Sequence, residues 1–231
     1  MKAPSPTLTN WPTEMSDVAV HIFLRLLQQE VVMSERIDSI ELNEIPLEEI
    51  EGERIVLRPL GESDVQPLFT LIDESRNFLS EHLPWPDECQ STDYVFAKIE
   101  SWEMQSQMAN GACWGIFEKT PNGEVIAGCI MLGYVQWAHR SATVSYWLGK
   151  RFCGRGLATE ALLLMASEAF AIGINRLELS ASVNNPKSAA VARRAGFYEE
   201  GICREYERLH GHYEDHIRFA LLARDFSCFS D

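Results

Sequence analysis

The stretch that most constrains the fold is RFCGRGLATEA, residues 151–161, where two glycines one residue apart separate two kinds of pattern. Residues 141–149 before it (SATVSYWLG) have the composition of a strand. Residues 157–172 after it have the spacing of a helix that closes at Gly173. The sequence therefore predicts a helix N-terminus at the end of a strand, where free N–H groups and the helix dipole favour an anionic ligand.

Several kinds of turn can hold two such glycines. A dinucleotide fingerprint requires a third glycine, where this chain has Thr159, and an acid at the end of the next strand, whereas Glu178 falls inside its predicted strand. A Walker loop requires Gly-Lys-Ser/Thr, which does not follow here. The other interpretations are a plain tight turn and a cradle for a pyrophosphate that is held rather than cleaved. Coenzyme A carries such a pyrophosphate, and Arg151 and Arg155 add positive charge.

The chain around this turn alternates strands and helices from residue 53 onward. Thr120-Pro121-Asn122-Gly123 is the clearest hairpin signal, and Asn185, Pro186 and Gly196 mark the cap, the first residue and the end of a short helix. The predicted strands are residues 53–60, 113–120, 124–135, 141–149, 176–183, 197–207 and 215–225, and the predicted helices are residues 62–79, 91–107, 157–172 and 184–197. This order predicts a single α/β (α+β) domain.

Composition divides the chain into three parts. Residues 1–52 are an N-terminal extension with one amphipathic helix, for which Ser16 or Asp17 is the cap. Residues 53–226 form the domain, and residues 227–231 form a C-terminal tail. No apolar stretch reaches the roughly 18–20 residues of a membrane span, so we expect a cytoplasmic protein without a membrane partner.

Charge and cysteine spacing exclude two further classes. The net charge is −14, from 34 acidic and 20 basic residues, which argues against a nucleic-acid partner. The same charge is compatible with a cationic acceptor such as an amine or a basic protein tail. The six cysteines occur singly and lack metal-ligand spacing, so we expect reduced thiols and no metal site.

The glycine motif belongs to an ordered set of motifs that resembles a known family. RxxGxG at 151–156 is followed by NNPKS at 184–188, AGF at 195–197 and GHYEDH at 211–216. Together with ERIVLRPL and HLPWP upstream, this set resembles the GNAT acyltransferase superfamily, in its RimJ/RimL branch of protein N-terminal acetyltransferases. The resemblance covers residues 53–226. It implies a GNAT fold, with a mixed, mostly antiparallel twisted sheet of about seven strands flanked by helices, and acetyl-CoA as co-substrate.

The resemblance also implies which residues bind acetyl-CoA. The strand at 141–149 would splay from its neighbour and free backbone N–H groups near Trp147 and Leu148, which would stabilise the developing oxyanion. Asn185 would contact the coenzyme and also cap its helix. The expected acetyl-CoA-binding residues are Trp147, Leu148, Arg151, Gly154, Arg155, Gly156, Leu157, Ala158, Thr159 and Asn185.

The catalytic groups depart from the pattern of many relatives. The strand glutamate that serves as base is Thr143 here, and the tyrosine that serves as acid is Ala192. RimL-like enzymes resemble this chain in having Glu207 and Ser188, which we expect as the catalytic pair. From the residues alone, two structural alternatives stay open. Glu207 fits a plain surface acid equally well, and Ser188 fits a capping residue of its helix. A glutamate with an ordinary pKa of about 4.3 needs burial or a relaying water to act as a base.

The acceptor is expected on the side of HLPWP, with Trp85 and Tyr146 as substrate-binding residues, although Trp85 also fits a structural role in the core. An α-amine has a pKa of about 7.7–8 and lysine one near 10.4, so a weak base favours an α-amino acceptor. The prediction is acetyl transfer to a protein N-terminus, with ribosomal proteins as candidates, by a monomer or homodimer. A small-molecule amine acetyltransferase and a non-catalytic CoA-binding or interaction protein are the alternatives.

Overall fold

The computed structural model describes residue 45 and residues 47–226. In these residues eight strands form one sheet with the order β1-β2-β3-β4-β5-β6-β8-β7. The strands are β1 (Ile50–Glu51), β2 (Ile55–Pro59), β3 (Ala112–Thr120), β4 (Gly123–Gln136), β5 (Ser141–Leu148), β6 (Arg176–Ser182), β7 (Tyr198–Leu209) and β8 (His212–Leu222). All seven predicted strands are present, the last with different ends, and the two-residue β1 precedes them. The predicted helix of residues 1–52 and the tail at 227–231 lie outside the described residues.

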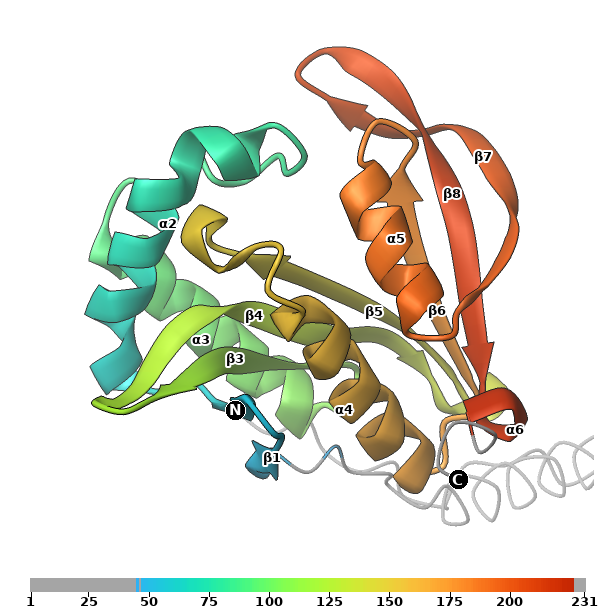
Figure 1. Cartoon of the computed structure of the whole chain (residues 1–231), viewed down its shortest axis with the longest axis horizontal. Coiled ribbons are helices and arrows are strands. Elements are labelled where there is room, and N and C mark those ends of the chain that lie inside the picture. Colours follow the sequence, from blue (N-terminus) through green and yellow to red (C-terminus); the bar gives the residue numbers. More distant parts are fainter. Residues whose placement is uncertain (1–44, 46, 227–231) are drawn as a thin grey trace, which may run out of the picture. The chain divides into compact units, whose positions relative to one another are not determined.

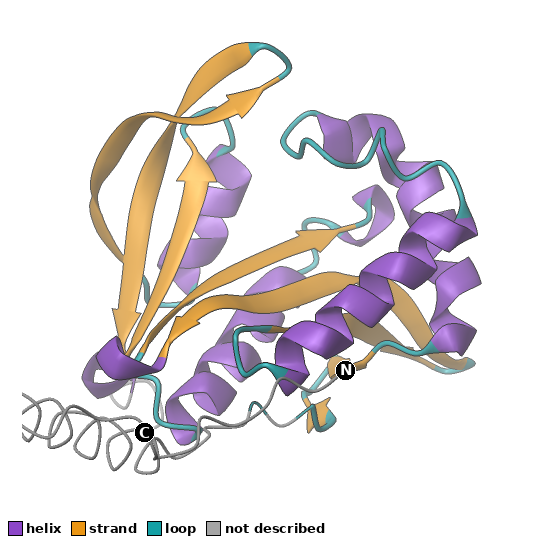
Figure 2. Ribbon diagram, turned by 180° about the vertical axis from the view of Figure 1, so that it is seen from behind, coloured by secondary structure: helices purple, strands orange, loops and turns teal. Residues whose placement is uncertain are grey.

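Helices cover both faces of this sheet. In Figure 1 α4 and α5 lie in front of the sheet and α3 lies behind it, and Figure 2 brings α3 to the front. The α-helices are α2 (Val65–Ser80), α3 (Thr92–Gln107), α4 (Leu157–Ala171), α5 (Pro186–Arg194) and α6 (Ala223–Phe226), and the short 3-10 helices are η1 (Glu62–Asp64), η2 (Trp137–His139) and η3 (Lys150–Phe152).

The sheet consists of two antiparallel parts that separate from one another. The pairing of β5 with β6 is parallel and covers three residue pairs, from Ser141 against Arg176 to Thr143 against Glu178. Beyond Thr143 the two strands diverge, as Figure 2 shows. On either side the pairing continues, because β5 remains bonded to β4 and β6 to β8. The sheet is therefore closed at one end of the β5–β6 junction and open at the other.

The core lies between the sheet and the helices on each face. Trp114, Ile130, Leu162 and Phe219 are among its fully buried side chains. Burial of each such side chain contributes about 1.5–3 kcal/mol. Phe219 carries the core into the second part of the sheet, where α5 covers β6 and β8. One continuous core therefore packs against both parts of the sheet.

Local signals read from the sequence are confirmed at two turns. Thr120 pairs with Gly123 across the β3–β4 hairpin, and Gly123 has a positive φ of 109°. The side chain of Asn185 accepts a hydrogen bond from the Ser188 N–H at 3.1 Å, and Pro186 is the first residue of α5. Capping and proline geometry therefore fix where α5 begins.

The prediction for the last strand was wrong at its end. The predicted strand at 215–225 stops at Leu222, and residues 223–226 form α6 instead. The reason is the length of the partner strand, because Leu222 pairs with Arg176, the first residue of β6. Beyond that residue β8 has no ladder to continue, and the chain turns into a helix.

The described cysteines are free thiols. Cys89, Cys113 and Cys129 are buried, Cys153 is half-buried and Cys203 is exposed. Among the described residues no group of three or more His, Cys, Asp or Glu side chains is arranged to hold a metal ion. No helix in the described part of the chain is both long and apolar enough to cross a membrane.

Candidate active site

The glycine turn delivers the N-terminus of α4 to the open end of β5. Gly154 and Gly156 have φ values of 75° and 82°, in the left-handed region that glycine adopts at least cost. Gly156 caps α4, and its carbonyl accepts hydrogen bonds from the N–H groups of Thr159 and Glu160, each at 3.1 Å. The preceding first-turn N–H groups have no carbonyl within their own helix to reach. The predicted anion cradle is therefore present as a backbone geometry.

The two arginines expected to add charge to this cradle are both paired with carboxylates. Arg155 donates to Glu118, with one contact at 3.0 Å, and Arg151 lies 3.3 Å from Glu74. Both arginines are exposed, so these pairs contribute little to stability. In this arrangement the backbone N–H groups and the helix dipole carry more of the attraction for an anion than the arginines do.

Alternation along β5 decides which backbone groups face the gap beside β6. The Gly149 N–H donates to Ala127 of β4 at 2.8 Å. A Cβ on Gly128 would lie 2.0 Å from the Trp147 carbonyl oxygen, so that carbonyl also faces β4. Since successive residues of a strand point their backbone groups to opposite sides, the N–H of Leu148 faces the gap. Of the two predicted oxyanion donors, Leu148 fits and Trp147 does not.

The side chains of Tyr146 and Trp147 point in opposite directions from β5. The Tyr146 hydroxyl lies 3.1 Å from the Ser188 hydroxyl on α5. Burial raises the pKa of the Tyr146 phenol, and the hydrogen bond with Ser188 partly offsets that effect. Trp147 instead makes an edge-on contact with Trp85, with ring centroids 5.6 Å apart. Tyr146 therefore contacts Ser188 of α5, and Trp147 contacts the loop that is predicted to bind the acceptor.

Glu207 lies beside a buried histidine. The Nε2 atom of His216 is 3.2 Å from the Glu207 carboxylate, although the two groups are not aligned as a hydrogen bond. The Tyr206 ring covers the imidazole, with centroids 4.8 Å apart. Burial lowers the pKa of His216 below its ordinary value, and the Glu207 charge opposes this shift. The imidazole is therefore neutral at pH 7, and Glu207 is not neutralised by it.

The loop that carries Trp85 is held at both ends. Arg76 of α2 donates to the carbonyls of Pro86 and of Cys89, the latter at 2.7 Å. At the other end, Nε2 of His210, in the β7–β8 turn, lies 2.6 Å from the Ser80 carbonyl at the end of α2. The turn of the β7–β8 hairpin and the Trp85 loop thus meet at the end of α2.

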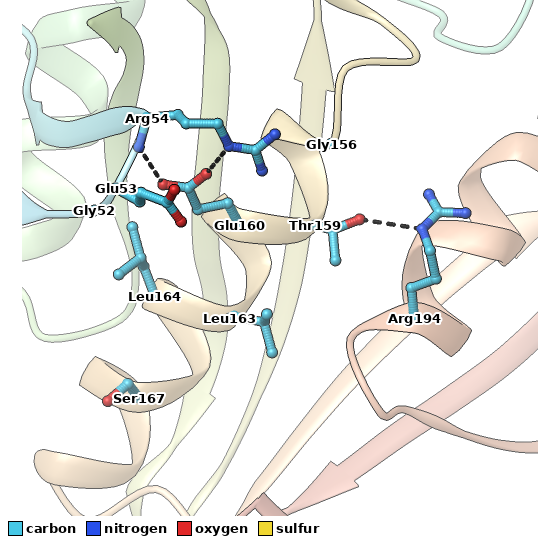
Figure 3. A pocket seen from close by; sticks show the side chains of 10 residues that line it. All are labelled: Gly52, Glu53, Arg54, Gly156, Thr159, Glu160, Leu163, Leu164, Ser167 and Arg194. Atoms are coloured by element: carbon cyan, nitrogen blue, oxygen red, sulfur yellow. Dashed lines mark hydrogen bonds and ion pairs between the residues drawn. The ribbon is translucent and has the colours of Figure 1, made fainter. Parts of the chain in front are cut away.

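A pocket of about 510 Å³ lies on the outer side of the glycine turn (Figure 3). Gly156 and Thr159 line it, and Arg194 of α5 donates to the Thr159 hydroxyl at 3.4 Å. Sequence reasoning missed Arg54, Glu160 and Arg194, which also line it. The only signal for Glu160 was its position in the first turn of a helix, and Arg54 gave none, since its partners are more than 100 residues away.

These features define an α/β protein whose sheet opens beside a glycine turn and the N-terminus of α4. Comparison with known families gives the class a name: the profile of the acetyltransferase (GNAT) domain matches residues 54–198. The chain belongs to this acetyltransferase family. The resemblance to the GNAT superfamily is confirmed. The matched residues include the glycine turn, Asn185 and Ser188 but end before Glu207.

Relatives and solved structures agree with this assignment. YdaF of Bacillus subtilis, which is named as a ribosomal N-acetyltransferase, is 32% identical over 176 residues, covering 75% of this chain and 94% of YdaF. The ribosomal-protein-serine acetyltransferase of Escherichia coli is 27% identical over 165 residues, covering 71% and 90%. The RimL ribosomal L7/L12 α-N-protein acetyltransferase, solved with coenzyme A, is 26% identical with a TM-score of 0.71, covering 76% and 98%.

A further similar solved structure is named for a different role. The microcin C7 self-immunity acetyltransferase MccE, in complex with acetyl-CoA and AMP, is 26% identical with a TM-score of 0.70, covering 74% of this chain and 93% of MccE. The RimJ/RimL resemblance and the GNAT fold expected from the sequence are both confirmed by these similarities.

Proposed function

We propose that this chain transfers the acetyl group of acetyl-CoA to the N-terminal α-amine of a protein, with ribosomal proteins as the acceptor class. The observation that carries the proposal is the open β5–β6 junction beside the glycine turn, in a chain of the acetyltransferase (GNAT) family. Relatives named for ribosomal-protein serine and alanine acetylation support the acceptor class. The activity is assigned to residues 53–226, in a cytoplasmic monomer or homodimer.

The residues of the glycine turn fit the pyrophosphate of acetyl-CoA. Backbone N–H groups from Gly154 to Ala158 lie at the start of α4, and their attraction for an anion needs no side chain. The thioester of acetyl-CoA supplies the activated acetyl group. The Leu148 N–H, facing the gap, is placed to stabilise negative charge on the acetyl oxygen, and such a donor contributes several kcal/mol to catalysis. Asn185 already caps α5, so we assign it a mainly structural role.

Glu207 is the proposed base. An acceptor α-amine is mostly protonated at pH 7 and must lose a proton before its nitrogen can attack. The neighbouring His216 has a lowered pKa, so it does not hold the Glu207 carboxylate in an ion pair and leaves it available to accept that proton. Ser188 is proposed to donate a proton toward the leaving thiolate, and the Tyr146 hydroxyl, 3.1 Å away, offers a route by which the proton returns.

The acceptor is proposed to lie between the Trp85 loop and the β7–β8 hairpin. Trp85 and Trp147 form an aromatic wall there, and the net charge of −14 favours a basic acceptor. A small-molecule acceptor is the second candidate, since the similar self-immunity acetyltransferase MccE, solved with acetyl-CoA and AMP, is not named for a ribosomal protein. A CoA-binding protein without catalysis is the third.

Two measurements separate these candidates. Calorimetry with acetyl-CoA tests the coenzyme, and turnover against a panel of peptides with free N-termini and a panel of small amines tests the acceptor. The proposal predicts binding and turnover of peptides. Turnover of small amines alone would favour the second candidate, and binding without turnover of either panel would favour the third.

A further inference from the structure

Arg54, in the turn between β1 and β2, makes three hydrogen bonds to the start of α4 and the loop before it, and Figure 3 shows the two to Glu160. Its backbone N–H donates to Glu160 Oε1 at 2.8 Å, and its Nε donates to Glu160 Oε2 at 2.8 Å. Its Nη1 donates to the carbonyl of Arg155 at 2.7 Å. The turn before β2 is therefore tied both to the first turn of α4 and to the loop that leads into it.

The bond to the Arg155 carbonyl fixes the orientation of one peptide unit. That carbonyl shares its planar trans peptide with the N–H of Gly156, so the two point in opposite directions. With the carbonyl drawn toward Arg54, the Gly156 N–H points away from Arg54. A Cβ on Gly156 would lie 3.0 Å from the Arg54 guanidinium, so the guanidinium packs directly on this turn. Arg54 therefore holds the backbone donors of the turn in one orientation.

The bond to Glu160 removes a charge that would oppose an anion. Glu160 lies in the first turn of α4, and its side chain is 13% exposed while that of Arg54 is 48% exposed. An unpaired carboxylate at this position would compete with a bound pyrophosphate for the positive end of the helix dipole. Pairing with Arg54 neutralises it in place.

We infer that Arg54 is a positioning residue for acetyl-CoA binding. It orients the Arg155–Gly156 peptide and neutralises Glu160, and it is not itself the main contact of the coenzyme. This inference rests on the proposed function, because it assumes that the glycine turn holds the coenzyme. It predicts that replacing Arg54 weakens acetyl-CoA binding and changes neither the rate of the chemical step nor the binding of the acceptor.

The test uses the full chain with Arg54→Ala and Arg54→Lys, measuring acetyl-CoA affinity by calorimetry together with kcat and both KM values. Losing two bonds from a charged side chain predicts a rise of about tenfold in the KM for acetyl-CoA. We expect kcat and the acceptor KM to stay within about twofold. Arg54→Lys keeps the charge but lacks the planar guanidinium that bonds to both partners. Its KM for acetyl-CoA should lie between those of wild type and Arg54→Ala.

A double variant separates the two parts of the inference. Arg54→Ala combined with Glu160→Gln removes the unpaired charge but leaves the Arg155 carbonyl free, so affinity should recover only in part. Full recovery would overturn the positioning role. Arg193→Ala is the control, because Arg193 of α5 is about as exposed as Arg54 and also pairs with a glutamate, Glu199 of β7. It should leave acetyl-CoA affinity unchanged.

Thermal unfolding, measured on each variant, keeps folding apart from binding. If wild type binds no acetyl-CoA, the proposed function itself fails. If wild type binds and folded Arg54→Ala or Arg54→Lys binds equally well, only the inference about Arg54 is overturned.

Discussion

The hydroxyl of Tyr146 on β5 lies 3.1 Å from the hydroxyl of Ser188 on α5. Beyond Thr143 no parallel ladder joins β5 to β6, the strand that precedes α5, so this contact joins the two parts of the sheet at their open junction. Ser188 donates its backbone N–H to the Asn185 cap, which leaves its hydroxyl free for Tyr146. Ser188 therefore connects α5 to β5 through its hydroxyl, in addition to bonding to the helix cap through its backbone.

Ser188→Ala should lower kcat by about 100-fold, because general-acid catalysis typically contributes 10² or more. Acetyl-CoA affinity should be nearly kept, since the Asn185 cap bonds only to the backbone of residue 188. Tyr146→Phe should lower kcat less, because the serine hydroxyl remains. Steady-state kinetics and calorimetry provide the readouts. Ser106→Ala, whose hydroxyl bonds to the Ile45 carbonyl, is the control. Wild-type kcat in Ser188→Ala would remove the serine from the mechanism.

Glu207→Gln should lower kcat by about 10²-fold or more while acetyl-CoA affinity is retained, because the amide cannot accept the proton of the acceptor amine. The variant should recover part of its rate at high pH, where more of the acceptor amine is already neutral. Glu205→Gln, two residues earlier on the same strand, is the matched control. An unchanged rate at pH 7 in Glu207→Gln would show that Glu207 is a surface acid.

His216 should make the stability of the protein depend on pH in a defined window. Burial lowers the folded-state pKa of this histidine, so between that value and the ordinary pKa of about 6.5 the unfolded chain binds more protons. Stability should therefore fall as pH drops below about 6.5. In His216→Gln this part of the decline in melting temperature should disappear, whereas the exposed His212→Gln should keep it. Parallel pH profiles for wild type and His216→Gln would contradict this account of His216.

Alanine at the two glycines of the turn should have unequal effects. Either substitution places a Cβ in the left-handed region, at a cost of about 1–2 kcal/mol. At Gly154 nothing lies within 4 Å of that Cβ, but at Gly156 it would meet the Arg54 guanidinium at 3.0 Å. Gly156→Ala should therefore lose more acetyl-CoA affinity than Gly154→Ala, as measured by calorimetry. Equal losses at the two positions would argue against the role of Arg54.

The fold could be predicted from sequence where the signals are local. Thr120 to Gly123 mark a hairpin, and Asn185 with Pro186 begins α5, because turn and cap chemistry depends on neighbouring residues. The family motifs are local as well, since RxxGxG spans residues 151–156 and NNPKS spans residues 184–188. They gave the glycine turn and Ser188.

The rest of the site depends on contacts between distant segments. Arg54 and Glu160 are 106 residues apart, and only the packed structure brings them together. The choice of Leu148 over Trp147 as the free donor follows from the register with β4, which the pattern of β5 does not encode. Nothing in the sequence places His216 beside Glu207, because the two residues lie on different strands of the β7–β8 hairpin and meet only through its packing.

The most direct test is mass spectrometry of peptides incubated with the protein and acetyl-CoA. One peptide should carry a free α-amine and no lysine, and a second of otherwise equal sequence should carry a blocked α-amine and one lysine. The account predicts one acetyl group on the first peptide and none on the second, with the first reaction slowed by about 10²-fold or more in Glu207→Gln. Acetylation of the lysine peptide alone would contradict it.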